Sequence, residues 1–564
     1  MSGREGMRTA YGGGPVSLLI DMRTAIIASI FLLAITSVSC TSDDGRDRST
    51  ARIYDSNDPI DRGCALHPRY LTRIWRGYSD GSEDVTIVPQ APNFSGAFTV
   101  TSHSGPWDYV QNVPLVFYGP RYVRPSGTLS DPASIVDVFP TVGRLLDVDL
   151  PRREGRLLRA VPAGNAGVPK LIVTVVWDGA GRNVLERFPD AWPNLARLER
   201  EGTSYVEAVV GSSPSITPAT HSNLGTGAYP RRHGVTAVMR REPDGTVRSA
   251  FPGSDPAELR LTTFGDIIDQ ELGNEPLVGA LGWISWHQGM LGHGSQQEGG
   301  DEDQLGFLRT DFVRVPKRYY TAPDYLSEHR GPTKQQFRRL DRSDGELDGK
   351  WMGEPDLTKH ENPAFVEYQR DVLLRMLREE GYGSDPVPDL FFTNFKMSDI
   401  AAHAYGLDSP QVEAVISAQD QALGRLVEQL DRDVKDYVVV ITADHGATRS
   451  AVDSGAWPVR QGELARDIDE HFDVPEGRSV VLETSAVGPF LDRDLAAELG
   501  ITPDDVATFL NDYRIRDNWD GDLPEGYEGR GDEHALAAAF PRTRFPEIMR
   551  CAFGSARPPS GARG

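Results

Sequence analysis

Two aspartate–histidine pairs and one threonine are the residues of this chain best suited to carry out a reaction. Asp399 and His403 are spaced i, i+4, which places both side chains on one face if the segment is helical. Asp444 and His445 are adjacent, and Thr217 lies in the segment Pro-Ser-Ile-Thr-Pro-Ala-Thr-His. Carboxylate and imidazole groups in this number are typical ligands of a two-zinc hydrolase. The residue types therefore predict metal-dependent hydrolysis.

The elements that must position these residues resemble buried strands. Residues 437–441 are wholly apolar and lie just before Asp444 and His445. A second apolar run, residues 171–177, ends at Asp178, which would add another carboxylate ligand. Side chains at the carboxyl ends of neighbouring parallel strands meet at one edge of a sheet. We therefore predict an α/β fold in which a mainly parallel sheet lies between helices and carries the metal site at its carboxyl edge.

The composition limits the class of partner. The 564 residues are 39% hydrophobic and 25% charged, and the formal net charge is −23. Such an acidic chain repels the phosphate backbone, which argues against a nucleic-acid polymer as partner. A small anionic substrate remains compatible, because bound metal ions can reverse the local field. The sequence does not indicate an oligomeric state.

The first forty residues read as a targeting segment. Residues 24–38 are an apolar run of the length of a signal-peptide core, too short for a comfortable membrane span. Met22 directly precedes this run and is a candidate true start. Cys40 closes it in a context that resembles a bacterial lipoprotein cleavage site. A lipid anchor on Cys40, a cleaved secretory signal and a retained anchor are the alternatives, and each places the mature protein outside the cytoplasm.

The remaining two cysteines lie near the two ends of the mature chain. In an oxidising compartment a disulfide between Cys64 and Cys551 is plausible, and two unpaired buried thiols are the alternative.

Several segments in this order resemble the type I phosphodiesterase/nucleotide pyrophosphatase branch of the alkaline phosphatase superfamily. The resemblance is carried by Val175-Val-Trp-Asp-Gly-Ala180, Pro193–Gly202, Pro214–His221, Gly225-Thr-Gly227, Pro230–Gly234, Ser398–Gly406 and Ala443–Gly446. It implies a three-layer alkaline-phosphatase-like sandwich and two divalent metal ions, which we expect to be zinc. It also implies that Thr217 is the nucleophile and forms a covalent phospho-threonine.

The resemblance assigns the ligands residue by residue. One metal would be bound by Asp178, Thr217, Asp444 and His445, and the other by Asp399, His403 and His103. His103 is assigned because the family has its last histidine ligand near the C-terminus, where His471 and His534 do not fit the motif. The matching context is Thr101-Ser-His-Ser-Gly-Pro-Trp-Asp-Tyr109, followed by the strand-like residues 113–119.

The early position of His103 predicts a circular permutation of the fold. Compact domains often have neighbouring termini, so joining the old ends and opening a new break can preserve the structure. The new break would lie between Cys551 and Cys64, which should then be spatial neighbours, and this favours their disulfide. The alternative is that His103 is an ordinary loop histidine and the third ligand is missing. The predicted division of the chain is: signal peptide 1–40, flexible linker 41–60, permuted segment 61–155, linker 156–169, nucleophile core 170–240, cap insertion 241–386, metal core 387–450, α+β subdomain 451–551 and disordered tail 552–564.

Charge favours a diester as the substrate. Three carboxylates and an ionised threonine nearly balance two Zn²⁺ ions, so a phosphomonoester dianion would need a further cation. Relatives that cleave monoesters have an Asn where this chain has Val238, and a Lys/Arg pair in a loop that corresponds to residues 285–293. That loop has neither Lys nor Arg; its His287 and His293 are weak candidates for substrate contacts. His221, four residues after Thr217, is a weak candidate for supporting the nucleophile.

Other readings of the same residues remain open. A phosphomonoesterase (alkaline phosphatase) or a phosphonate-ester hydrolase would use the same site. From another class, an inactive binding lipoprotein would keep the fold without turnover. A sulfatase is disfavoured, because Thr217-Pro-Ala-Thr-His lacks the Cys or Ser that such enzymes modify.

Overall fold

The computed structural model describes residues 56–96, 100–164, 166–559 and 564. The predicted signal peptide, with Met22 and the lipidation candidate Cys40, lies outside these residues. Within the part of the chain that is described, none of the helices combines the length and the apolar character that crossing a membrane requires.

A ten-stranded sheet forms the centre of the molecule. Its main path runs through β13 (Val313–Arg314), β12 (Asp303–Leu308), β11 (Val278–Gly282), β15 (Asp389–Phe395), β6 (Leu171–Trp177), β16 (Tyr437–Thr442), β3 (Leu115–Tyr118), β7 (Thr203–Tyr205) and β4 (Gly127–Leu129), and β14 (Tyr320–Thr321) pairs with β12. The central strands β11, β15, β6 and β16 are parallel, whereas β3 is antiparallel to β16 and to β7. The mainly parallel sheet predicted from the sequence is confirmed.

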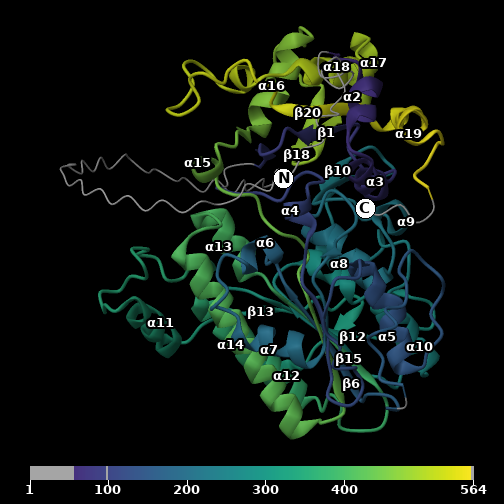
Figure 1. The fold of residues 1–564 in the computed structure, drawn as a ribbon, viewed down its shortest axis with the longest axis vertical. Coiled ribbons are helices and arrows are strands. Elements are labelled where there is room, and N and C mark those ends of the chain that lie inside the picture. The colour runs from purple at the N-terminus through teal and green to yellow at the C-terminus, as the bar shows by residue number, and fades with distance from the viewer. Residues whose placement is uncertain (1–55, 97–99, 165, 560–563) are drawn as a thin grey trace, which may run out of the picture. The chain divides into compact units, whose positions relative to one another are not determined.

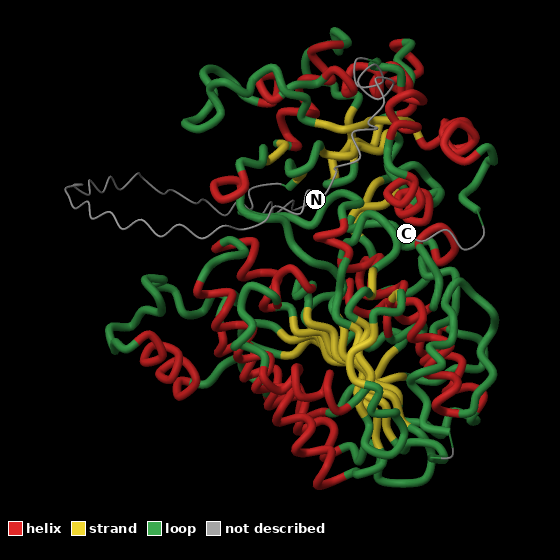
Figure 2. The backbone as a smooth tube through the Cα atoms, viewed as in Figure 1, coloured by secondary structure: helices red, strands yellow, loops and turns green. Residues whose placement is uncertain are grey.

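Alternate residues of each central strand face two separate hydrophobic cores, because successive side chains of a strand point to opposite faces. In β6, Val173 and Val175 pack in one core, and Ile172 and Val176 pack in the other. The first core is covered by α7 (Pro193–Glu201), α12 (Pro363–Glu379), α13 (Met397–Tyr405) and α14 (Pro410–Asp433), and the second by α5 (Val138–Leu146), α8 (Thr217–Thr226) and α10 (Phe264–Glu271). Figures 1 and 2 show the strands between these two helical layers. The architecture is thus a three-layer α/β sandwich.

A third, smaller core joins the two ends of the described chain. Strand β1 (Val85–Pro89) pairs antiparallel with β20 (Leu536–Pro541), although they are far apart in sequence. Around them lie α16 (Gln461–His471), β18 (Val481–Ser485), β19 (Gly488–Leu491), α17 (Arg493–Leu499) and α18 (Pro503–Asp512). Residues 451–541 therefore fold together with an N-terminal strand.

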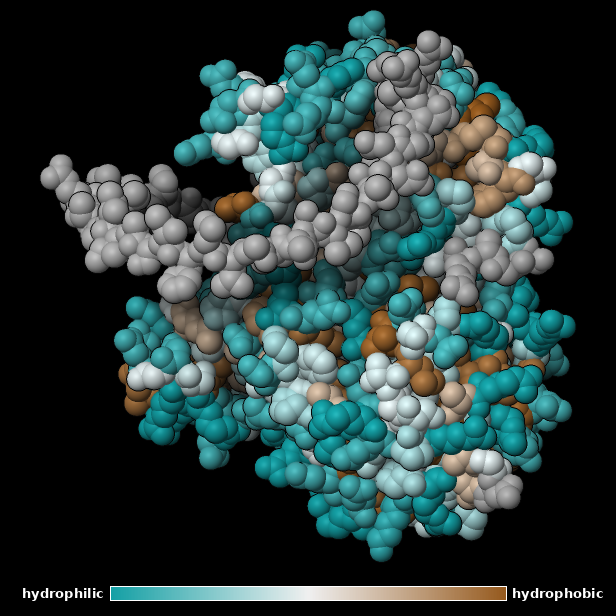
Figure 3. Space-filling model, viewed as in Figure 1, coloured by the Kyte–Doolittle hydropathy of each residue, from teal (hydrophilic) through white to brown (hydrophobic). Residues whose placement is uncertain are grey.

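A disulfide links the same two ends. Cys64 on α2 (Pro59–Ala65) is bonded to Cys551 on α19 (Phe545–Phe553), with their Cα atoms 5.8 Å apart. The adjacent helix α3 (Pro68–Gly77) packs with α19 and β20 in one apolar cluster. Hydrophilic side chains cover most of the face seen in Figure 3, as expected for a chain with this net charge.

Three predicted segment boundaries are wrong. Residues 241–386 are largely not a cap: β11, β12, β13 and β14 extend the central sheet, and α10 and α12 cover its two faces. The strand β11 was missed because its sequence, Val-Gly-Ala-Leu-Gly, has low strand propensity and is held by parallel neighbours on both sides. The predicted linker 41–60 overlaps α2, whose first residues are capped by the Asp58 carboxylate. The predicted tail from 552 overlaps the end of α19, which stops at the left-handed Gly554.

Candidate active site

Three parallel strands bring the carboxylates together. The strand register pairs Phe395 of β15 with Trp177 of β6, so that Lys396 and Asp178 follow side by side at the carboxyl edge. Asp444 leaves the same edge two residues after β16 and accepts a hydrogen bond from the Gly179 amide at 3.0 Å. Asp178 and Asp444 are buried almost completely. The sheet edge therefore holds these charged side chains within a small, dry volume.

Asp399 is presented by the first turn of α13, and a glycine makes room for it. Gly179 has φ of +70°, and a Cβ atom there would lie 2.9 Å from the Asp399 Cβ. A side chain at position 179 would push α13 away from the sheet edge. The glycine that follows Asp178 thus sets the distance between the two carboxylates.

Three histidines point one ring nitrogen at this group. Each of them hydrogen-bonds a backbone carbonyl through Nδ1: His103 at 2.7 Å (Ser215), His403 at 2.8 Å (Thr101) and His445 at 2.9 Å (Gly446). A carbonyl accepts only, so Nδ1 carries the proton and Nε2 presents a lone pair. The Nε2 atoms lie 3.9, 3.3 and 3.9 Å from the Asp399 Oδ1 atom, respectively. Metal-binding histidines are commonly oriented in this way.

The donor set passes a physical test for metal binding. Ligand atoms of Asp178, Asp444 and His445 lie within 4.8 Å of one another, as do those of His103, Asp399 and His445. The Asp444 Oδ2 and His445 Nε2 atoms are buried without a hydrogen-bond partner, although such atoms normally have one. A cation bound between them would satisfy both. These side chains fit a divalent ion that takes oxygen and nitrogen ligands.

Thr217 is the first residue of α8 and is buried beside the same carboxylates. The contact that locates its hydroxyl comes from Lys396, whose Nζ atom lies 3.3 Å from Thr217 Oγ1. The same Nζ atom lies 2.9 Å from Asp178 Oδ1 and 2.7 Å from Asp399 Oδ2. Lys396 thus ties the hydroxyl to two predicted metal ligands. The position of Thr217 at a helix N-terminus also favours an anion next to its hydroxyl.

Lys396 controls the electrostatics of the centre. Burial alone would raise the pKa of Asp178 and of Asp399, but the Lys396 ammonium holds both well below their usual range. Burial would lower the pKa of Lys396, and the surrounding carboxylates raise it instead, so the ammonium stays protonated. At Asp444, burial together with the neighbouring Asp178 outweighs the effect of Lys396 and raises the pKa. In the absence of other cations, the site therefore holds one permanent positive charge.

Lys396 is the functional residue that the sequence reasoning missed. It directly follows the apolar part of β15 and precedes Asp399 by three residues. An apolar run that ends in Lys, next to the run that ends in Asp178, is a signal of the same kind as those used for the carboxylates. The pattern of metal-ligand residue types at strand ends does not indicate Lys396, because lysine is not such a residue type.

The weaker candidates separate into two groups. His221 hydrogen-bonds the Thr217 carbonyl through Nδ1 at 2.8 Å and Asn394 through Nε2 at 2.8 Å, and His287 Nε2 lies 3.5 Å from Asp178 Oδ2. Both therefore lie directly behind the predicted ligands. The suggestion that His293 contacts substrate is wrong: its ring is held between the Asp266 carboxylate (2.8 Å) and the Leu259 carbonyl (2.7 Å).

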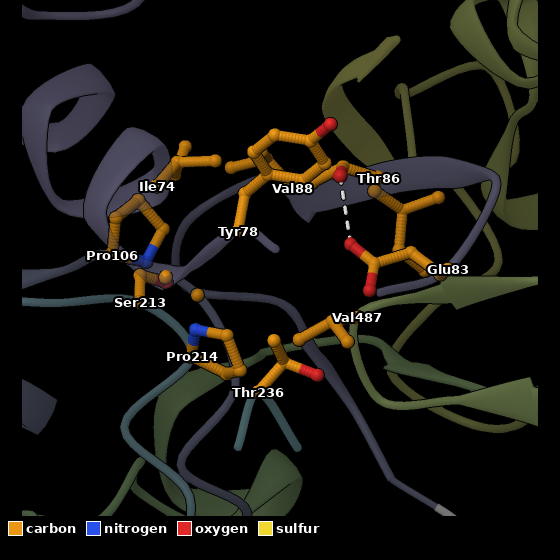
Figure 4. A pocket seen from close by; sticks show the side chains of 13 residues that line it. Ile74, Tyr78, Glu83, Thr86, Val88, Pro106, Ser213, Pro214, Thr236 and Val487 are labelled. Atoms are coloured by element: carbon orange, nitrogen blue, oxygen red, sulfur yellow. Dashed lines mark hydrogen bonds between the residues drawn. The ribbon is translucent and has the colours of Figure 1, made fainter. Parts of the chain in front are cut away.

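One small cavity lies beside Ser213 and Pro214, in the segment that precedes Thr217. It has room for about one water molecule (≈20 Å³) and is lined by Tyr78, Glu83, Pro214 and Thr236, among others (Figure 4). The Glu83 carboxylate accepts a 2.7 Å hydrogen bond from Thr86, and burial raises its pKa to about 7. This cavity does not include Thr217 or the metal-ligand candidates, so it is separate from the reaction centre.

A three-layer sandwich with this cluster of aspartates and histidines at its carboxyl edge is the arrangement of a metal-dependent hydrolase. The family model for "Type I phosphodiesterase / nucleotide pyrophosphatase" matches residues 172–522, which is more than half of the chain. The chain therefore belongs to this family of the alkaline phosphatase superfamily. The match includes Thr217 and all the ligand candidates except His103.

The relatives are distant. The alkaline phosphatase PhoD of Zymomonas mobilis subsp. mobilis is 29% identical over 84 residues, which is 15% of each chain. The alkaline phosphatase PafA of Elizabethkingia meningoseptica is 20% identical over 398 residues, covering 61% of this chain and 72% of PafA. The crystal structure of wild-type PafA has a TM-score of 0.47 at 15% identity, covering 66% of this chain and 84% of that one. The chain thus spans only a small part of PhoD and about three quarters of PafA.

Proposed function

We propose that this protein hydrolyses phosphoesters by transferring the phosphoryl group to Thr217, and that diesters are its preferred substrates. One observation carries the proposal: a single ammonium, Lys396 Nζ, touches the Thr217 hydroxyl and two carboxylates of the metal-binding cluster. A buried hydroxyl at a helix N-terminus within a cluster of Asp and His residues is arranged for attack on an electrophilic phosphorus atom.

Two divalent ions, zinc in our proposal, would be held by the seven predicted ligands. Asp178, Thr217, Asp444 and His445 would hold one, and Asp399, His403 and His103 the other. When bound, the ions supply positive charge to the nucleophile, to the phosphoryl oxygens and to the leaving oxygen. The carbonyl partners of the three histidines fix which ring nitrogen faces the ions, and thereby keep the ligands oriented before binding.

The chain's own residues define the two steps. Thr217 Oγ1 attacks phosphorus in line with the leaving oxygen, the bond from phosphorus to that oxygen breaks, and an alcohol departs. Water then attacks the phosphorus of the phospho-threonine, which breaks its bond to Oγ1 and releases a phosphomonoester. Throughout, the Lys396 ammonium lies against Oγ1 and opposes the negative charge that Oγ1 carries when it attacks and again when it leaves.

Two features support diesters as the preferred class. The matched family is named for phosphodiesterases, and the segment from Ser285 to His293 beside the site contains no Lys or Arg. In that segment His287 is buried with its Nε2 atom 3.5 Å from Asp178 Oδ2, and burial lowers its pKa, so it adds no cation. A monoester dianion therefore finds no additional cation there.

Lys396 favours a second candidate, phosphomonoester hydrolysis. The balance between two divalent ions, three carboxylates and an ionised threonine is neutral, and Lys396 makes it positive by one charge. A more positive centre binds a dianionic phosphoryl group better. PafA and PhoD, two of the relatives, are named alkaline phosphatases.

An oxidising, extracytoplasmic location is part of the proposal. The disulfide between Cys64 and Cys551 supports it, since such bonds persist outside reducing compartments. The proposal includes two alternatives: a lipid anchor on Cys40 that holds the protein at the cell envelope, or release of the protein.

We also propose that the fold is circularly permuted. His103 precedes the matched residues 172–522 and still contacts Asp399 and His445 at the site. Strand β3 likewise precedes the matched segment and pairs with β16 in the central sheet. Both facts are what a relocated C-terminal segment would give.

The decisive experiment compares hydrolysis of bis-p-nitrophenyl phosphate and p-nitrophenyl phosphate by the zinc-loaded protein from residue 41 onward. Thr217→Ser, which keeps a hydroxyl, should retain turnover, whereas Thr217→Ala should abolish it. Acid quenching followed by mass spectrometry should find a p-nitrophenylphosphoryl group on Thr217 with the diester and a phosphoryl group with the monoester. Turnover by Thr217→Ala at the wild-type rate would overturn the nucleophile, and a larger kcat/KM for the monoester would select the second candidate.

A further inference from the structure

A second cluster of carboxylates lies between α10 and the start of β12, at the amino end of this parallel strand. Asp269 belongs to α10, Asp303 begins β12, and Asp301 lies two residues earlier. Their ligand oxygens lie within 4.8 Å of one another. Asp269 and Asp303 are only 4% and 6% exposed.

The buried members of this cluster lack partners. The Asp269 Oδ1 atom is inaccessible to solvent and has no hydrogen bond. Every charged group that shifts the pKa of Asp303 is another carboxylate, and the same holds for Asp269. Burial and these neighbours raise the pKa of Asp269 to about 7. Asp266 is a further carboxylate near the cluster, and it pairs with His293.

Several other buried carboxylates of the chain are paired with arginine. Asp84 pairs with Arg241 and Arg493, and Glu258 pairs with Arg240. Burying ionised carboxylates without a partner is costly, and proteins usually avoid it by pairing them or by coordinating a metal. Asp269 and Asp303 have no cationic side chain beside them among the described residues, and a bound cation would balance their charge.

A cavity of suitable size lies among these side chains. It holds about one water-sized sphere (≈10 Å³) and is lined by the cluster and by Gly294, Gln297 and Gly300. The backbone oxygens of Gly294 and Gln297 face Gly300 at this cavity: a Cβ atom on Gly300 would lie 2.9 and 3.3 Å from them. The lining of the cavity therefore includes four carboxylate side chains and, among the described residues, no cationic side chain.

We infer that Asp269, Asp301 and Asp303 bind one calcium ion. Carboxylate and carbonyl oxygens suit hard cations, and Ca²⁺ binds them at about 2.4 Å, which allows ligands up to about 4.8 Å apart. Mg²⁺ needs shorter bonds and usually keeps several waters, for which this cavity has little room. Calcium is therefore the better match.

The bound ion would fasten the segment that reaches the reaction centre. Residues 285–290 carry His287 against Asp178, and residues 294–303 continue from there to the cluster. Calcium would connect this segment to α10 and hold it against the sheet. We therefore expect calcium to stabilise the fold, whatever reaction Thr217 performs.

The test is isothermal titration of calcium chloride into the zinc-loaded protein, with Asp301→Asn and Asp303→Asn as variants. Wild type should bind one Ca²⁺, with a rise in Tm of about 3 °C at saturation, and the two variants should lose both effects. Asp494→Asn, an exposed charge elsewhere, should behave as wild type. Asp399→Asn should also keep calcium binding, which separates this site from the reaction centre.

The sign of the stability change gives an independent check. In calcium-free buffer Asp303→Asn should raise Tm, because it removes an unpartnered buried charge. With calcium the order should reverse, because only wild type gains from the ion. Absence of binding in wild type, or equal binding in wild type and Asp301→Asn, would overturn the calcium site.

Discussion

Replacing Lys396 with methionine tests the assignment of this residue most directly. Methionine has a similar length and no charge, so it fills the space but removes the ammonium from Thr217 Oγ1. At the observed separation of 3.3 Å, Coulomb's law with an effective dielectric constant of about 20 gives ~5 kcal/mol for a full charge on Oγ1. Only part of that charge changes between the ground state and the transition state, so we expect kcat to fall by about 10²–10³.

The assay is hydrolysis of bis-p-nitrophenyl phosphate by protein whose zinc content is measured in the same preparation. Lys334→Met, on the exposed side of α11 (Lys334–Asp341), controls for the loss of one positive charge. Lys396→Ala offers a second control, since added methylammonium should restore part of its activity if the missing group is an ammonium. A Lys396→Met protein that keeps two zinc ions and loses less than threefold in kcat would refute the reasoning.

Four further outcomes follow from the contacts described. His103→Ala should lower bound zinc from two ions to one by elemental analysis, whereas His293→Ala should keep two; equal zinc contents would remove His103 from the ligand set. Gly179→Ala should reduce zinc affinity at least tenfold in a chelator competition, because its Cβ would displace Asp399. Burial raises the pKa of Glu83 from 4.5 to about 7, so its protonation stabilises the fold below about pH 4.5 and this contribution is lost as pH rises through 7; Glu83→Gln should therefore gain up to ~3 kcal/mol over wild type at pH 8 and nothing at pH 4, measured by urea unfolding. Cys551→Ser should lower the unfolding free energy by about 2–4 kcal/mol, and an unchanged urea midpoint would contradict this.

The sequence was sufficient for the parts of the fold in which local pattern and tertiary context agree. Apolar runs ending in Asp178 and before Asp444 are strands buried on both faces, and their parallel pairing follows from the helices between them. It failed at β11, where glycines weaken the local signal and the neighbouring strands determine the conformation. It also failed for Lys396, because the role of a lysine depends on which carboxylates the strand register places beside it.

The cluster of Asp269, Asp301 and Asp303 is another feature that the sequence pattern does not predict. Glu298 to Asp303 reads as a solvated acidic stretch, since charge runs usually lie on the surface. In the fold, β12 pairs on both sides and carries Asp303 inward, next to Asp269 from a helix more than thirty residues earlier. The sequence pattern alone therefore does not predict that Asp269 and Asp303 lie side by side.

Cations decide what this acidic protein can bind. With a net charge of −23 the chain as a whole repels phosphates, and at the site three carboxylates outnumber the one ammonium. Burial lowers the pKa of His103 and of His445, whereas at His403 the neighbouring Asp399 outweighs burial and raises the pKa. Divalent ions on the ligand set would supply the positive charge that attracts a phosphoester. With two such ions bound, the formal charges of the ions, the three carboxylates and an ionised Thr217 would cancel. Lys396 would then add one positive charge next to Thr217. In the proposed mechanism, the charge that favours the substrate and the charge that assists Thr217 therefore belong to one side chain, Lys396.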